Sequence, residues 1–133
     1  MTEKKVVFIV ASDLGFMCWL GLTLGAAGFE ALPAKSVSDA KRLIRDFNLH
    51  VDVLIIDPKL DGAAKFAESL RQTPHHAKAI AVTAAKTSNT VGTHSSFEMW
   101  KVFPQRSDAK AAEDWVHAVE SQLTVTLKTA LNF

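Results

Sequence analysis

The sequence predicts an α/β fold in which a parallel, five-stranded, doubly wound sheet carries helices on both of its faces. Short apolar runs rich in β-branched residues alternate five times with segments of helical periodicity, and this alternation favours parallel strands joined by right-handed crossovers. The central run, Val53–Ile56, is apolar at every position, as expected for a strand that is buried on both faces. Asp57 follows directly. Because a carboxylate is costly to bury, we expect Asp57 at the carboxyl edge of the sheet.

The composition is that of a single globular domain spanning residues 1–133. The chain is long enough for one hydrophobic core, and it contains no repeat or dividing linker. Its net charge of +1 and its scattered lysines and arginines argue against binding to nucleic acid or to an anionic membrane. The single cysteine, Cys18, excludes an internal disulfide, and the apolar run after Lys5 is too short for a secretion signal. We therefore expect a cytoplasmic protein.

Two strand–helix units are predicted before the central run. The expected elements are a strand at 6–10, a helix at 14–27, a strand at 29–32 and a helix at 38–47. Ser12 or Asp13 is suited to cap the first helix, which should end at Gly28. Pro33 should close the second strand, and Ser38 should cap the second helix. The buried face of that helix is expected to hold Ala40, Leu43, Ile44 and Phe47.

Two further strands and two helices are predicted after the central run. The expected elements are a helix at 63–72, a strand at 79–83, a strand at 97–102 and a helix that begins at Ser107. The side chains expected to face the core are Phe66, Ala67 and Leu70 on the first of these helices and Trp115, Val119 and Leu123 on the last. Segment 86–96 is polar and contains Gly92, so we expect a mobile loop there rather than an ordered helix.

The ends of the predicted strands define a candidate site. Parallel strands place their carboxyl ends along one edge of the sheet, and open α/β folds use this edge for binding and chemistry. Residues 11–13, Asp57, Thr83 and Lys101 all stand at or directly after the end of an expected strand. We therefore expect these residues to converge.

In these features the chain resembles the receiver domain of two-component response regulators over residues 4–129. The resemblance rests on Asp57 in VDVLIIDPKLDG, on Thr83–Ala84 in AIAVTAA and on Lys101 in FEMWKVFP. It implies a flavodoxin-like sheet in which Asp57 accepts a phosphoryl group from a histidine kinase, while Thr83 and Lys101 contact that group. A carboxylate is the nucleophile for this transfer, and the charge on the phosphoryl oxygens calls for a lysine, a hydroxyl and a cation, usually Mg²⁺.

The chain departs from the family pattern where the metal ion would bind. Receiver domains carry an acidic pair directly after the first strand, and the count back from Gly28 places Ala11 and Ser12 at those positions, with Asp13 one residue later. The metal ligands that the resemblance implies are Asp13, Asp57 and the backbone carbonyl of Lys59. Because the number of charged ligands tunes the affinity for hard cations, we expect weak Mg²⁺ binding.

The lysine also departs from the pattern, since the usual Lys–Pro pair is Lys101–Val102 here and Pro104 comes later. These departures favour an atypical receiver, or pseudo-receiver, that is not an enzyme and acts through protein–protein interaction, with phosphorylation of Asp57 weak or absent. Two alternatives stay open. One is a working single-domain receiver in a phosphorelay, phosphorylated on Asp57 by a histidine kinase. The other is a small α/β enzyme or ligand-binding protein that uses the same edge.

The first predicted helix indicates where such a domain would bind. Residues 14–29 contain no charged side chain, and the run is too short to span a membrane. The face that should pack on the sheet holds Met17, Leu20, Gly21 and Leu24. The solvent side then holds Cys18, Trp19 and Leu22, and an exposed apolar face usually marks an interaction site. Its occupant would be a histidine kinase, another signalling protein or a second copy in a homodimer. Alternatively, the chain's own end, 127–133, covers this face.

Overall fold

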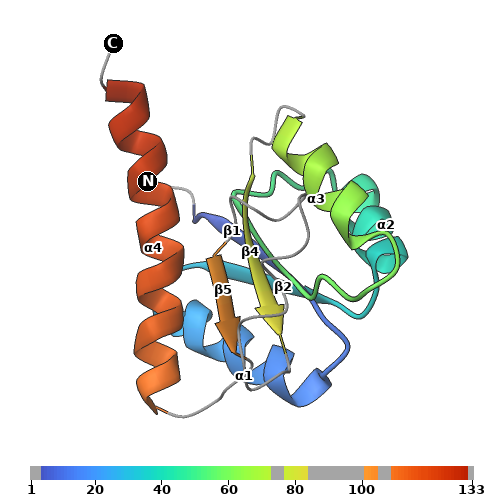
Figure 1. The fold of residues 1–133 in the computed structure, drawn as a ribbon, viewed down its shortest axis with the longest axis horizontal. Coiled ribbons are helices and arrows are strands. Elements are labelled where there is room, and N and C mark those ends of the chain that lie inside the picture. Colours follow the sequence, from blue (N-terminus) through green and yellow to red (C-terminus); the bar gives the residue numbers. More distant parts are fainter. Residues whose placement is uncertain (1–3, 73–76, 84–100, 105–108, 132–133) are drawn as a thin grey trace.

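A computed structural model describes residues 4–72, 77–83, 101–104 and 109–131 of the chain. It confirms the predicted α/β architecture, with a parallel five-stranded sheet in the order β2-β1-β3-β4-β5. The strands are β1 (Val6–Val10), β2 (Glu30–Ala34), β3 (Val53–Ile56), β4 (Lys78–Thr83) and β5 (Lys101–Pro104). The helices within the described residues are α1 (Leu14–Ala26), α2 (Val37–Phe47), α3 (Ala63–Gln72) and α4 (Ala109–Leu131) (Figure 1).

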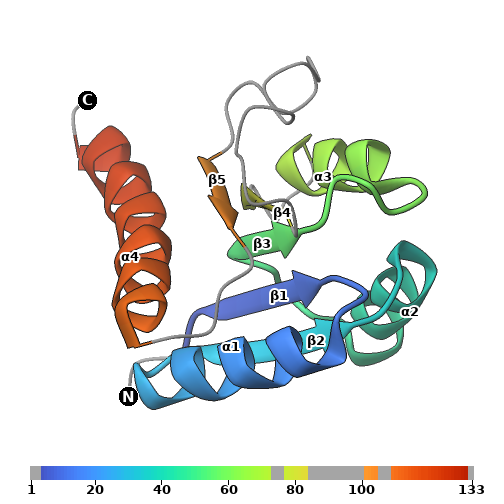
Figure 2. The ribbon, with the colours of Figure 1, turned by 60° about the horizontal axis from the view of Figure 1, so that its bottom comes forward.

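Helices cover both faces of the sheet, with α1 and α4 on one side and α2 and α3 on the other (Figure 2). The layers follow from the alternation of side chains along each strand. In β1, Val7 and Ile9 join the core beneath α1 and α4, whereas Phe8 and Val10 join the core beneath α2 and α3. The four residues of β3 also alternate between the two cores, and all four are fully buried. This confirms the two-sided burial that the apolar run predicts.

The start of α1 is set by Asp13. Its Oδ1 accepts the Phe16 N–H at 3.0 Å, so Asp13 rather than Ser12 is the N-cap. The buried side chains include three that were predicted: Met17, Leu20 and Leu24. Phe16 is buried as well, because α4 packs beside α1 and the ring centroid of Trp115 lies 5.9 Å from that of Phe16.

Two boundaries near the edge of the sheet differ from prediction. β2 continues through Pro33 to Ala34, because an edge strand has one side without a neighbour and there tolerates a residue that lacks an N–H. α2 is capped by Ser36, whose Oγ accepts the Asp39 N–H at 3.1 Å. The predicted cap, Ser38, instead lies within the first turn of the helix.

The prediction that Phe47 is buried is wrong, since its side chain is 69% exposed. The other three predicted residues of the face, Ala40, Leu43 and Ile44, do pack into the core. α2 ends immediately after Phe47, where Asn48 adopts a left-handed backbone conformation with φ 49°. Phe47 therefore stands in the last turn, past the part of the helix that covers the sheet.

The last helix packs as predicted. Trp115 and Val119 of α4 are fully buried, and Leu123 packs against the same core. The last turns of α4 point away from α1 (Figures 1 and 2), so the alternative in which residues 127–133 cover the first helix is wrong for the part up to Leu131. The predictions for 86–96, 97–100, Ser107 and 132–133 fall outside the described residues.

Candidate functional site

Asp57 lies at the carboxyl edge of the sheet, directly after β3. Its N–H donates to the carbonyl of Val10, the last residue of β1, at 2.9 Å, which holds the start of the loop beside the neighbouring strand. Its Oδ1 accepts the Lys59 N–H at 2.9 Å, so the carboxylate forms an Asx turn. The residue is half-buried. Asp57 thus turns the chain and also leaves its carboxylate partly accessible at the edge.

The loop after β1 offers little negative charge to this edge. Ala11 is buried, and its N–H donates to the carbonyl of Ala34 at 3.2 Å. Ser12 is exposed. Asp13 is exposed as well, but its carboxylate accepts the Phe16 N–H as the cap of α1. The single acid of the loop therefore already has a structural role.

The acidic side chains that the resemblance implies as Mg²⁺ ligands are Asp13 and Asp57. Asp13 and Asp57 each accept a backbone N–H, from Phe16 and Lys59 respectively. Mg²⁺ demands near-ideal octahedral geometry from oxygen ligands, and each of the two carboxylates uses its Oδ1 to accept the backbone N–H. Over the described part of the chain, no group of three or more histidine, cysteine, aspartate or glutamate side chains is placed to hold a metal ion.

The strand register places Thr83 at the carboxyl edge and Lys101 away from it. Thr83 ends β4 and pairs with Pro104, the last residue of β5, whereas Lys101 begins β5 and pairs with Ile80. Through Ile80, Lys101 is level with Ile55, which is two residues before Asp57, or roughly 7 Å back along the strand. The described part of β5 runs to Pro104, beyond the predicted end of the strand, and the convergence of the Lys101 side chain with Asp57 stays a prediction. The side chains of Thr83 and Lys101 lie outside the described part.

The pair that does end β5 is Phe103–Pro104, which the sequence interpretation missed. The proline was the signal that could have found it. When the Lys–Pro pair of the resemblance is aligned on Pro104 instead of on Lys101, Phe103 takes the lysine position. That position is opposite Val82, next to the last residue of β4.

An apolar stripe, formed by Leu14, Cys18 and Leu22, runs along the outward face of α1. Leu14 is 56% exposed, Leu22 is 77% exposed, and Cys18 is an exposed free thiol. The three residues are four positions apart, so they lie on one face of the helix. Trp19 differs from prediction because it is half-buried against the core, with its ring centroid 6.1 Å from that of Phe16.

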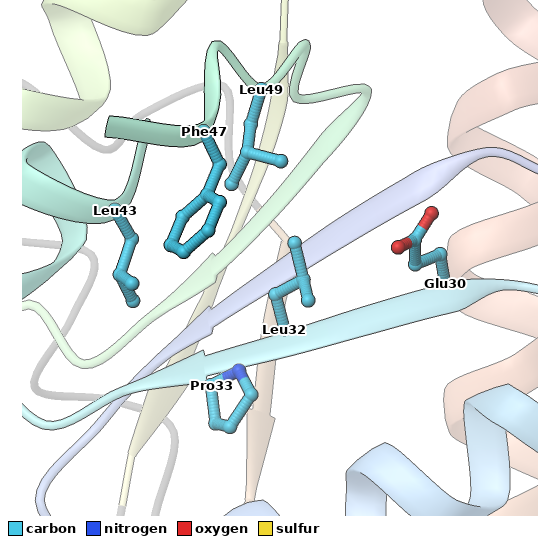
Figure 3. A pocket seen from close by; sticks show the side chains of 6 residues that line it. All are labelled: Glu30, Leu32, Pro33, Leu43, Phe47 and Leu49. Carbon is cyan, nitrogen blue, oxygen red and sulfur yellow. The ribbon is translucent and has the colours of Figure 1, made fainter. Parts of the chain in front are cut away.

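A pocket of about 390 Å³ opens between β2 and the end of α2 (Figure 3). Its lining consists of Glu30, Leu32, Pro33, Leu43, Phe47 and Leu49. The sequence interpretation missed this pocket because it placed Phe47 in the core. Without that ring in the core, the space beside the edge strand stays open.

No protein-family model matches the sequence, and no curated protein is significantly similar to it. Solved structures do match. The signal receiver domain of an HD domain-containing protein from Pseudomonas fluorescens Pf-5 aligns with 100% of this chain and 96% of its own, at a TM-score of 0.76 and 15% identity. A response regulator from Thermotoga maritima, solved in complex with Mg²⁺–BeF, aligns with 86% of this chain and 98% of its own, at a TM-score of 0.66 and 20% identity.

A third match is an atypical orphan response regulator whose structure revealed a phosphorylation-independent regulatory mechanism. It aligns with 90% of this chain and 95% of its own, at a TM-score of 0.68 and 16% identity. Together these similarities establish that the chain has the fold of response-regulator receiver domains. Among the helices of the described residues, none combines the length and the apolar character that a membrane span requires.

Proposed function

We propose that this chain is an atypical receiver domain that acts in signal transduction by binding another protein, with phosphorylation of Asp57 weak or absent. The receiver fold supports the class of protein. The observation that carries the proposal is the loop after β1. There, Ala11 and Ser12 stand at the positions of the family's acidic pair, and the remaining acid, Asp13, caps α1.

We infer that the chain lacks some of the groups that would balance the negative charge of the transition state for phosphoryl transfer to Asp57. The transition state spreads negative charge over three oxygens, which receiver domains balance with Mg²⁺, a lysine and a hydroxyl. Thr83 is the last residue of β4, at the carboxyl edge where receiver domains carry the hydroxyl. The position on β5 where they carry the lysine corresponds to Phe103 when the Lys–Pro pair is aligned on Pro104. With the metal ligands reduced as well, we assign to Asp57 mainly the role of turning the loop after β3.

The apolar stripe on α1 is the surface that we assign to the partner, a histidine kinase or another signalling protein in the cytoplasm. Its side chains are exposed, and the last turns of α4 point away from it. Covering such a surface removes apolar area from water, at about 25 cal/mol per Å². A second copy of the chain is the alternative occupant. Light scattering on Leu22→Glu distinguishes the two, because this substitution would dissociate a dimer that the stripe holds together.

Treatment with acetyl phosphate and Mg²⁺, followed by measurement of the intact mass, tests the chemistry of Asp57. We expect little or no phosphoryl adduct on the natural sequence, and no saturable binding of beryllofluoride in the presence of Mg²⁺. Asp57→Asn is the matched control, because it keeps the size of the side chain and removes the nucleophile.

A stoichiometric adduct that Asp57→Asn abolishes would overturn this proposal. It would favour the second candidate, a working single-domain receiver that a histidine kinase phosphorylates on Asp57. The shared edge position of Asp57 and Thr83 favours that candidate.

A further inference from the structure

Two adjoining cavities follow the open edge of β2. The first, about 390 Å³, lies between β2 and the end of α2 (Figure 3), and the second, about 290 Å³, lies where β2 ends between α1 and α2. The two share Pro33 and Leu43. The two cavities therefore adjoin, and together they are here called the β2 groove. Its apolar lining consists mainly of Leu14, Leu32, Pro33, Leu43, Phe47 and Leu49.

The β2 groove exposes large apolar side chains. Three such side chains are mainly exposed over the described part of the chain, and two of them border the groove: Phe47, and Leu14, which is also the first residue of the apolar stripe on α1. Figure 3 shows the ring of Phe47 between Leu43 on one side and Leu32 and Leu49 on the other. An apolar surface of this kind, bordered by polar residues, is typical of a contact site.

The two ends of the groove carry opposite charges. Glu30 lines it at the start of β2, and Lys35 lines it directly after β2. Both side chains are exposed, and neither forms an ion pair with another described residue, whereas Arg42 is paired with Asp39 at 3.3 Å. Five residues of extended chain separate Glu30 from Lys35 by roughly 16 Å.

We propose that the β2 groove binds the β2 groove of a second copy of this chain around a twofold axis. With the axis between Leu32 and Pro33, Glu30 of each copy faces Lys35 of the other, and the two apolar middle sections meet. Such an isologous contact forms both ion pairs at once and closes after two copies. The formal net charge of +1 leaves little repulsion between the copies.

The edge strand favours packing of side chains over an extension of the sheet. The Glu30 N–H donates to the carbonyl of Lys5 at 2.9 Å, and because the direction alternates along a strand, Ala31 and Pro33 direct their backbone groups toward the open edge. Pro33 has no N–H, so a second strand cannot form a continuous ladder there. The contact therefore depends on the groove, on Phe47 and on the two charged ends.

Sedimentation velocity and light scattering on the full chain, over a range of concentrations, test the dimer. We expect a reversible dimer for the natural sequence. We expect the Kd of the dimer to rise roughly tenfold or more in each of three variants, Phe47→Ser, Glu30→Lys and Lys35→Glu. Phe47→Ser removes apolar contact, and each charge change places like charges opposite each other at both symmetry-related contacts. Glu30→Lys combined with Lys35→Glu exchanges the two charges, and the Kd should return to near the natural value.

Leu22→Ser is the matched control, because it replaces a similarly exposed apolar side chain on α1, outside the groove, by the same residue as Phe47→Ser does. We expect it to leave the Kd unchanged. A chain that stays monomeric at every concentration overturns the proposal, as does a dimer that Leu22→Ser dissociates and Phe47→Ser does not. If the double charge exchange fails to restore the dimer, the twofold pairing is wrong. These outcomes do not involve Asp57, so they are independent of the proposed receiver function.

Discussion

Asp13 shows, at the scale of a single residue, how a side chain near the candidate site is used for folding. Its Oδ1 accepts the Phe16 N–H at 3.0 Å at the start of α1. Replacing an N-cap aspartate by alanine typically costs about 1 kcal/mol. We therefore expect Asp13→Ala to lower the free energy of unfolding by about 1 kcal/mol in urea denaturation. Asp13→Ser keeps a capping oxygen and should stay close to the natural value. Equal losses in the two variants would contradict the capping role.

At the scale of an element, α1 has one face that packs into the hydrophobic core and one face that is exposed to solvent. Phe16 is 5% exposed and contacts Trp115 of α4, whereas Leu22 is 77% exposed. Phe16→Ala leaves a cavity between two helices and should cost about 3–5 kcal/mol of unfolding free energy. Leu22→Ala should change it by less than about 0.5 kcal/mol. Chemical denaturation of both variants checks this difference. A large loss for Leu22→Ala would mean that the apolar stripe is structural rather than a contact surface.

The elements also show which features a sequence can predict. Val53–Ile56 and the helix at 63–72 were placed correctly, because their signals, an unbroken apolar run and a helical period, are local. Ser36 and Ser38 are equally good caps by residue type, so residue type alone does not identify Ser36, whose Oγ accepts the Asp39 N–H in the structure. Lys101 was misplaced because the part of β5 that reaches the carboxyl edge depends on its register with β4, a contact between strands that no local pattern contains.

For the whole molecule, the loss of acids at the carboxyl edge has a consequence for stability. A ligand that binds only the native state raises the free energy of unfolding by RT ln(1 + [L]/Kd). Ala11 and Ser12 carry no charge and Asp13 is used as a cap. We therefore expect the denaturation midpoint of the natural chain to be independent of millimolar Mg²⁺.

Ser12→Asp should make the stability of the whole chain depend on Mg²⁺. Ser12 is exposed and follows β1, the neighbour of β3, so the new carboxylate adds a charged oxygen ligand at the carboxyl edge without displacing the cap of α1. At a Mg²⁺ concentration of about 100 times Kd, the free energy of unfolding should rise by about 2.7 kcal/mol. Ser12→Asn is the neutral control and should show no such dependence. If Mg²⁺ stabilises the natural chain as much as Ser12→Asp, the existing residues already hold the ion, and the expectation of weak Mg²⁺ binding is wrong.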